Sequence, residues 1–77
     1  LAVNNELLKK LKELRFKLAM KKRVPAFVVF SDATLMDMCS RMPVNETEFL
    51  EVSGVGKVKL EAYGKEFLKV INSFESL

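Results

Sequence analysis

The sequence contains no histidine and only one cysteine, Cys39. Without histidine, mechanisms that use an imidazole as general base are excluded, and so are the usual histidine-containing zinc sites. A single cysteine cannot form a disulfide framework, which favours a reducing, intracellular setting. No base or cationic partner stands beside Cys39 in the sequence, so we expect it to be a small core residue and not a reactive thiol.

Long apolar runs are also missing, since none approaches the roughly 18 residues needed to span a membrane. No signal peptide is visible, because the charged start leads directly into a helical pattern. The 77 residues are enough for one domain at most, residues 1–77, with a modest core. The first residue is Leu1 and not methionine, so we expect the chain to be a piece of a longer protein.

Charge is distributed unevenly along the chain. Residues 1–23 hold eight Lys/Arg and two Glu, whereas residues 24–53 hold one Arg and five carboxylates. Residues 54–77 are nearly balanced, with four Lys and three Glu. A basic N-terminal segment is a possible footprint for a polyanion such as nucleic acid. A solvated helix face has the same composition, and charge alone does not separate the two interpretations.

Apolar residues recur at helical spacing in most of the chain. Leucines spaced by four, three and four residues predict one long helix over residues 4–22, with Phe16 and Met20 as a small apolar patch on its opposite face. Pro25 interrupts the pattern, so residues 23–30 are expected to form a loop that places Val28, Val29 or Phe30 in the core.

Three further segments have helical signals. Ser31 or Asp32 can cap a helix that Pro43 ends, and Asn45 with Glu48 resembles a capping box for a short helix ending near residue 52. The last segment, residues 57–74, has one apolar face, and Gly64 is expected to split or kink it. Together the segments predict an all-α, bundle-like domain with about five helices.

Between the last two helical segments stands "SGVGKVK", in which Gly54 and Gly56 are one residue apart. A P-loop needs four residues between its glycines, and a dinucleotide fingerprint needs a third glycine and a preceding strand, so neither nucleotide motif fits. A turn between helices fits, because glycine permits a positive φ and a close backbone approach. The turn could serve only as a tight corner closed by Val55. Alternatively, the N–H groups that begin the next helix could meet phosphate, with Lys57 and Lys59 beside them.

The order of these features resembles an HRDC domain (helicase and RNase D C-terminal). The resemblance covers roughly residues 6–74, and its most specific parts are "VVFSDATL" and "VSGVGKVKLEAYG", which look most like the version found in bacterial RecQ helicases. It implies a compact five-helix globule with a helix-hairpin-helix-like turn. It also implies an accessory module of an ATP-dependent DNA helicase, bacterial, cytoplasmic and nucleoid-associated. The motor and its ATP and magnesium site would lie outside this chain.

The resemblance to bacterial relatives also implies weak binding of single-stranded DNA, through an aromatic side chain that lies beside basic residues. Carried over to this sequence, the aromatic is Phe27, where relatives often have Pro and Tyr at positions 26 and 27. The expected nucleic-acid contacts are therefore Lys21, Lys22, Arg23, Phe27, Lys57 and Lys59, with Gly54, Val55 and Gly56 forming the hairpin turn. No metal ligand, catalytic residue or cofactor is expected in this domain, and a monomer is expected.

Two other functions remain open. The acidic middle segment and the Phe16/Met20 patch suit a protein-interaction module or one that docks on the helicase core of its own chain. A lyase that attacks a sugar through Lys57 or Lys59 would need a placed carboxylate, for which Glu61 and Glu66 are the nearest that follow in the sequence. Within the family, an RNase D-like exonuclease is the alternative parent.

Overall fold

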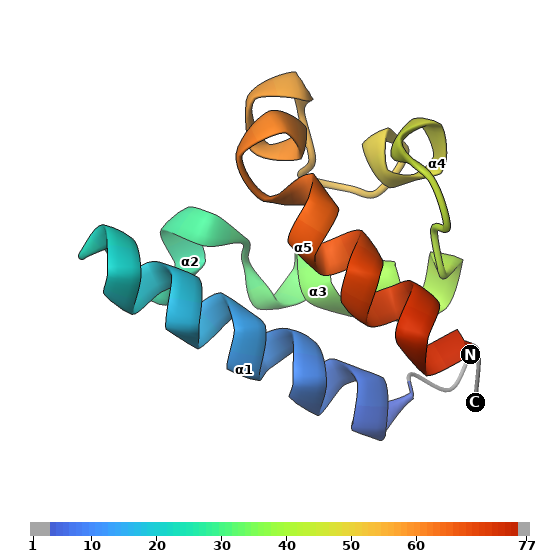
Figure 1. Ribbon diagram of the computed structural model, residues 1–77, viewed down its shortest axis with the longest axis horizontal. Helices are drawn as coiled ribbons and strands as arrows, with labels where there is room; N and C mark the ends of the chain where they lie inside the picture. The colour runs from blue at the N-terminus through green and yellow to red at the C-terminus, as the bar shows by residue number, and fades with distance from the viewer. Residues whose placement is uncertain (1–3, 76–77) are drawn as a thin grey trace.

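The computed structural model describes residues 4–75, which form five helices and no strand within that range. The helices are α1 (Asn5–Lys22), α2 (Ala26–Val29), α3 (Asp32–Arg41), α4 (Glu46–Leu50) and α5 (Lys57–Glu75). Figure 1 shows α1 and α5 as the two long helices, with α2 and α3 following α1 and the α4–α5 hairpin at the opposite side. The all-α, five-helix prediction is confirmed.

Local capping fixes most of the helix starts. The side chain of Asn4 accepts hydrogen bonds from the N–H groups of Glu6 and Leu7, at 3.0 and 3.1 Å, and Ser31 accepts one from Thr34 at 3.2 Å. These bonds satisfy donors that a helix N-terminus otherwise leaves free. At α4, Asn45 accepts from the N–H of Glu48 at 2.8 Å. The Glu48 carboxylate in turn accepts from the N–H of Val44 and not from that of Asn45, so the box is displaced by one residue.

The expected loop at residues 23–30 is wrong in part, because Ala26–Val29 forms the single turn α2. Proline fixes its own φ and lacks an N–H, and this suits Pro25 as the residue that precedes a helix. The side chains of this short segment lie partly in the core and partly in solvent. Val29 is fully buried, as is Phe30 immediately after the helix, whereas Phe27 is 68% exposed.

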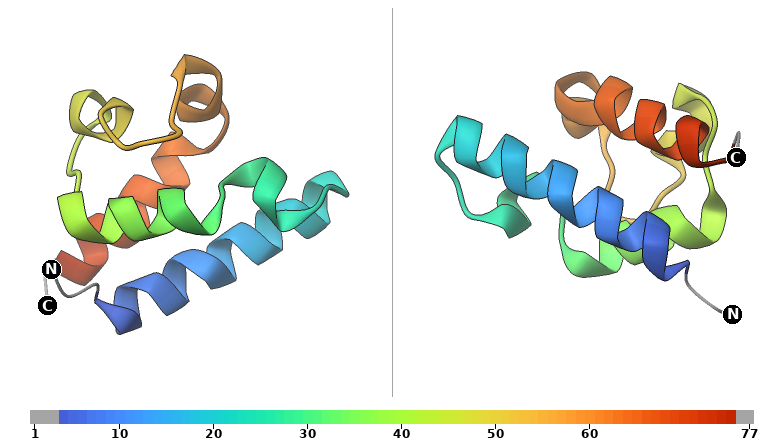
Figure 2. Two further views of the ribbon diagram at one scale, coloured as in Figure 1. Left: turned by 180° about the vertical axis from the view of Figure 1, so that it is seen from behind. Right: turned by 60° about the horizontal axis from the view of Figure 1, so that its bottom comes forward.

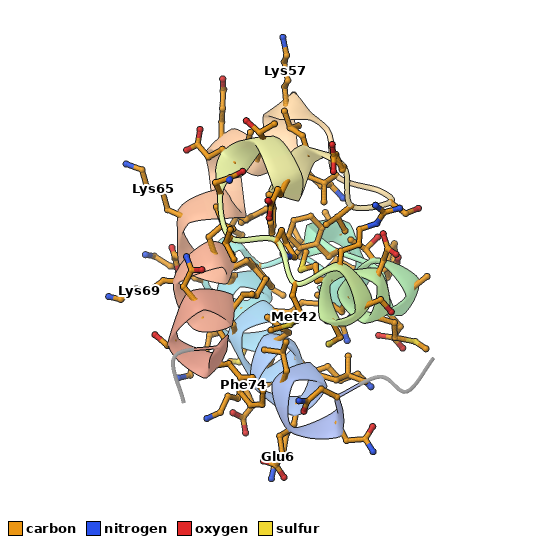
Figure 3. All side chains as sticks on the ribbon, turned by 90° about the vertical axis from the view of Figure 1, so that its right-hand side faces the viewer. Glu6, Met42, Lys57, Lys65, Lys69 and Phe74 are labelled. Carbon is orange, nitrogen blue, oxygen red and sulfur yellow. The ribbon has the colours of Figure 1, made fainter. Side chains whose placement is uncertain are left out.

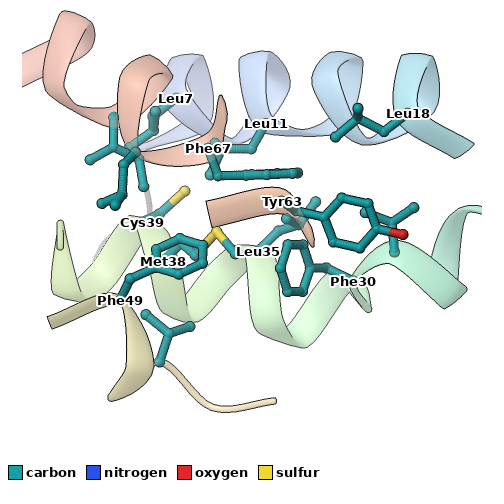
Figure 4. Close-up of a cluster of buried hydrophobic side chains, with 14 of the residues drawn as sticks. Leu7, Leu11, Leu18, Phe30, Leu35, Met38, Cys39, Phe49, Tyr63 and Phe67 are labelled. Atoms are coloured by element: carbon teal, nitrogen blue, oxygen red, sulfur yellow. The ribbon is translucent and has the colours of Figure 1, made fainter. Parts of the chain in front are cut away.

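Phe30 belongs to the core, to which all five helices contribute side chains and which Figure 4 shows in close-up. The rings of Phe49, Tyr63 and Phe67 meet it edge to face at centroid distances of 6.2, 5.7 and 5.0 Å, a favourable geometry for aromatic pairs. Cys39 is buried and free in the same core, and burial raises the pKa of its thiol. The prediction that Cys39 is a core residue is confirmed.

Gly64 does not divide the last helix, since α5 runs without a break from Lys57 to Glu75. The expected split is wrong, whereas the alternative, a kink, agrees with Figure 1 and Figure 2, which show the first turns of α5 (orange) set at an angle to the later turns (red). A Cβ at Gly64 would lie 2.7 Å from Leu60 Cδ1 and 3.9 Å from Phe49 Cδ2. A side chain at position 64 would therefore press on the end of the Leu60 side chain of the same helix, while Phe49 of α4 would be at an ordinary contact distance.

The α4–α5 turn is held from behind by α3. Gly54 has a φ of +87°, and a Cβ there would collide with the hydroxyl oxygen of Thr34. The N–H of Ser53 donates a 2.8 Å hydrogen bond to Asp37, and this bond is the main cause that holds the pKa of the Asp37 carboxyl below its ordinary value. Gly56 has neither a positive φ nor any neighbour near its missing Cβ.

Candidate nucleic-acid interface

Two lysines from distant parts of the sequence lie over two aromatic rings that are themselves in contact. The Nζ atom of Lys22, in the last turn of α1, is 5.1 Å from the centroid of the Tyr63 ring. The Nζ atom of Lys59, in the first turn of α5, is 5.6 Å from the centroid of Phe30. Both distances are within the range of a cation–π contact. We call these four residues, Lys22, Phe30, Lys59 and Tyr63, the aromatic–lysine cluster.

The cluster gives the lysines defined positions at the protein surface. A lysine is a flexible point charge, and ordering it costs side-chain entropy. Here each ammonium group lies over a ring that belongs to the core, since Phe30 is 1% and Tyr63 8% exposed, and a cation–π contact offsets part of that cost. Sequence reasoning assigned Tyr63 and Phe30 to the core but gave no signal that they would carry the two lysines.

Phe27 lies on α2, the turn that follows the end of α1 and packs against it. Its side chain is 68% exposed, the second most exposed large apolar side chain among the described residues after Val58. The prediction that Phe27 lies at the surface is confirmed. Lys21 and Arg23 are exposed at the same end of α1, where positive charge also suits the negative helix C-terminus.

Arg15 holds this end of the molecule together, a role that sequence reasoning missed. Its guanidinium donates to the carbonyl oxygen of Phe30 at 3.0 Å and pairs with Asp32 at 2.7 Å. The first of these contacts joins α1 to the residue that ends α2, and the second joins it to the start of α3. Arg15 also lowers the pKa of Asp32, mainly by its hydrogen bond. Because its side chain is only 12% exposed, Arg15 is a structural cation and not part of the surface charge.

Lys57 and Lys59 point in different directions, since residues two apart on a helix do not face each other. Lys59 belongs to the aromatic–lysine cluster, whereas Lys57 lines a shallow hollow with Glu46 and Leu50 of α4. Figure 3 shows Lys57 projecting from one extremity of the molecule. Of the basic residues expected to bind nucleic acid, the structure thus places Lys21, Lys22, Arg23 and Lys59 near α2, and it separates Lys57 from them.

The hairpin turn faces its own domain on one side. Val55 is half-buried against the core, and its N–H donates to the carbonyl of Val52 at 3.1 Å. The turn is therefore a tight corner closed by Val55. Within residues 4–75, no group of three His, Cys, Asp or Glu side chains could hold a metal ion. In the same range, no helix is long and apolar enough to cross a membrane.

The model of the HRDC domain family matches residues 4–71. The chain belongs to the HRDC family. The fold agrees, because the solved structure titled "D. radiodurans RecQ HRDC domain 3" superposes with a TM-score of 0.89 at 40% identity, over 95% of this chain and 96% of that one.

Curated relatives of this HRDC domain include ATP-dependent DNA helicases of two kinds. It is 44% identical over 71 residues to RecQ of Bacillus subtilis, covering 92% of this chain and 12% of that protein. It is 38% identical over 69 residues to UvrD2 of Mycobacterium bovis, covering 90% of this chain and 10% of that protein. The chain therefore spans about one eighth of the RecQ relative, and such a helicase contains far more than an HRDC domain.

Proposed function

We propose that this HRDC domain is an accessory nucleic-acid-binding module of a RecQ-type ATP-dependent DNA helicase. It contacts single-stranded or partly unwound DNA through backbone charge and one aromatic side chain. The motor, with its ATP and magnesium, lies in the rest of that protein, and the domain supplies no catalytic residue. The similarity to RecQ over nearly the whole chain supports the parentage.

The observations that support DNA binding are the aromatic–lysine cluster and the exposed ring of Phe27, which lies on α2 three residues before Phe30 of the cluster. Single-strand binders combine positive charge, which follows the phosphates, with aromatic side chains on which bases stack. Lys22 and Lys59 supply two cations that lie over aromatic rings, and Lys21 and Arg23 supply two more. A base stacked on Phe27 would bring its own phosphates to this end of α1.

The test is the affinity of the domain for a fluorescent oligo-dT, measured at several salt concentrations. For single strands, log K falls with log[salt] by about 0.7 per phosphate contact. Replacing Lys22→Ala and Arg23→Ala together should therefore weaken binding and reduce the slope by about 1.4. The matched control is Lys9→Ala with Lys12→Ala, which removes the same charge from the outer side of α1. Equal losses in the two double variants would reduce the effect to net charge and contradict the proposed site.

A second candidate function is protein docking, favoured by the exposure of Phe16 and Met20 on the outer side of α1. These side chains are 60% and 64% exposed, and they lie one turn apart. The helicase core of the same chain or another protein could cover them. Binding of the isolated helicase core that is lost on Phe16→Ala, with oligo-dT affinity unchanged, would favour this alternative.

A further inference from the structure

A shallow groove lies between α1 and α5, away from Phe27. Its lining residues are Lys10, Lys69, Val70, Ser73 and Phe74. Lys10 and Lys69 are exposed at its sides, while Phe74 is half-buried in its floor. Figure 3 shows Phe74 between the two long helices and Lys69 projecting outward from α5. Apolar surface between cations is the combination that accommodates bases and phosphates together.

Helix α1 runs from this groove to the end of the molecule that carries the aromatic–lysine cluster. On α1, Lys17 and Lys21 are seven and eleven residues after Lys10, spacings that return to the same helix face. At 1.5 Å per residue, the path from Lys10 to Lys21 is about 16 Å long. One nucleotide step advances about 3.4 Å along a duplex and further along an extended single strand, so this path spans a few nucleotides.

We propose that the α1–α5 groove is a second subsite for the same DNA strand, which continues from Phe27 along Lys21 and Lys17 to Lys10 and Lys69. The occupant is single-stranded DNA because the line of lysines is continuous with the proposed interface and complementary in charge to phosphate. The subsite rests on the proposed function and extends it. It sets the length of strand that the domain covers.

Carboxylates also stand beside this path, since Glu6 and Glu13 are exposed on α1 four residues before Lys10 and Lys17. On α5, the exposed Glu66 is seven residues before Ser73, so it lies on the same face of the later turns and provides a test of opposite sign. A negative charge beside the strand opposes phosphate. Glu66→Gln should therefore raise the affinity for a long strand severalfold, whereas Glu46→Gln on α4, with the same change of charge, should raise it less.

The main experiment compares a short and a long oligo-dT, of 4 and 16 nucleotides. A long strand offers more binding registers than a short one, and this alone raises its apparent affinity. The parent domain should bind the long strand more tightly than this statistical effect explains. Lys10→Ala with Lys69→Ala should remove this extra affinity and reduce the salt slope for the long strand by about 1.4, while leaving the short strand unaffected. Lys9→Ala with Lys12→Ala is again the matched control, and a thermal melt of each variant verifies folding.

The distance of the DNA strand from the groove can be tested with a photo-crosslinker. A thiol-specific photo-crosslinker attached to Ser73→Cys would stand at the groove, which Ser73 lines. Ser40→Cys on α3 is an exposed control, and native Cys39 is 6% exposed, so the unsubstituted protein serves as blank. The proposal expects crosslinks to the long oligonucleotide from position 73 and not from position 40.

The outcomes separate the subsite from the proposed function. If no oligo-dT binds even at low salt, the proposed function fails and the subsite fails with it. If the Lys22/Arg23 variant loses affinity but the Lys10/Lys69 variant binds the long strand as the parent does, the interface at Phe27 stands and the subsite is overturned. The same result would follow if a protein segment occupied the groove.

Discussion

The N–H of Ser53 donates a 2.8 Å hydrogen bond to the carboxylate of Asp37, sixteen residues earlier in the chain. The bond attaches the start of the hairpin turn to α3, and Arg41 pairs with the same carboxylate at 2.8 Å from the next turn of α3. Both interactions favour the ionised carboxylate, the Ser53 hydrogen bond most, so the pKa of Asp37 in the folded protein lies below its ordinary value.

Asp37→Asn should therefore destabilise the domain at neutral pH. A group whose pKa is depressed on folding contributes stability above its unfolded pKa and loses it as pH falls through the folded value. A hydrogen bond to a charged group contributes about 1.5–3 kcal/mol, and we expect a loss of about 1 kcal/mol because part of this carboxylate is exposed. Urea unfolding at pH 7 and pH 2 measures it. The difference between parent and variant should shrink at pH 2, and a constant difference would contradict the assignment to charge.

The two glycines of the hairpin should respond differently to substitution. Gly54→Ala forces a positive φ on alanine and directs its Cβ at Thr34, so it should cost more than about 1 kcal/mol. Gly56→Ala meets neither obstacle and should cost less stability. Its only expected cost is that alanine is less favourable than glycine at the position before a helix, here α5. Chemical denaturation of both variants tests this. Equal midpoints would mean that the left-handed conformation at position 54 is unimportant.

Lys59→Ala should weaken binding to oligo-dT more than Lys57→Ala does, although both remove one charge from the first turn of α5. The reason is position, because only Lys59 lies over Phe30 beside the end of α1. Fluorescence anisotropy at low and moderate salt gives the affinity and the slope for each. Lys57 stays a predicted contact, and a larger loss at Lys57 would move the interface towards α4.

Phe27→Ala should lower the affinity for oligo-dT by about 1–3 kcal/mol, the range found for a base stacked on an aromatic side chain. Its melting temperature should change little, because the ring is 68% exposed. Phe16→Ala, which removes another exposed phenyl ring, is the matched control and should leave affinity unchanged. Phe27→Tyr keeps a stacking face and should bind as the parent does. Intact affinity in the alanine variant would exclude stacking at this position.

Much of the architecture follows from local sequence signals. The leucine stripe predicted α1, Ser31 and Asn45 marked the starts of α3 and α4, and the interval around Gly54 placed the hairpin. These signals are reliable because capping and helical periodicity depend on neighbouring residues alone. The surface position of Phe27 came from the resemblance, since its composition and neighbours would equally suit a core aromatic.

Tertiary structure decided the features that depend on residues distant in sequence. Gly64 was expected to split or kink the last helix, and α5 continues through it as one helix whose first turns are set at an angle to the later turns. Residues 26–29 were expected to form a loop and instead form a helical turn, which buries Val29 and directs Phe27 outward. The cation–π contacts of Lys22 and Lys59 require Phe30 and Tyr63 to meet in the core. The sequence thus determined which lysines the domain has. The packing of the aromatic rings decided which two of them lie over a ring, Lys22 over Tyr63 and Lys59 over Phe30.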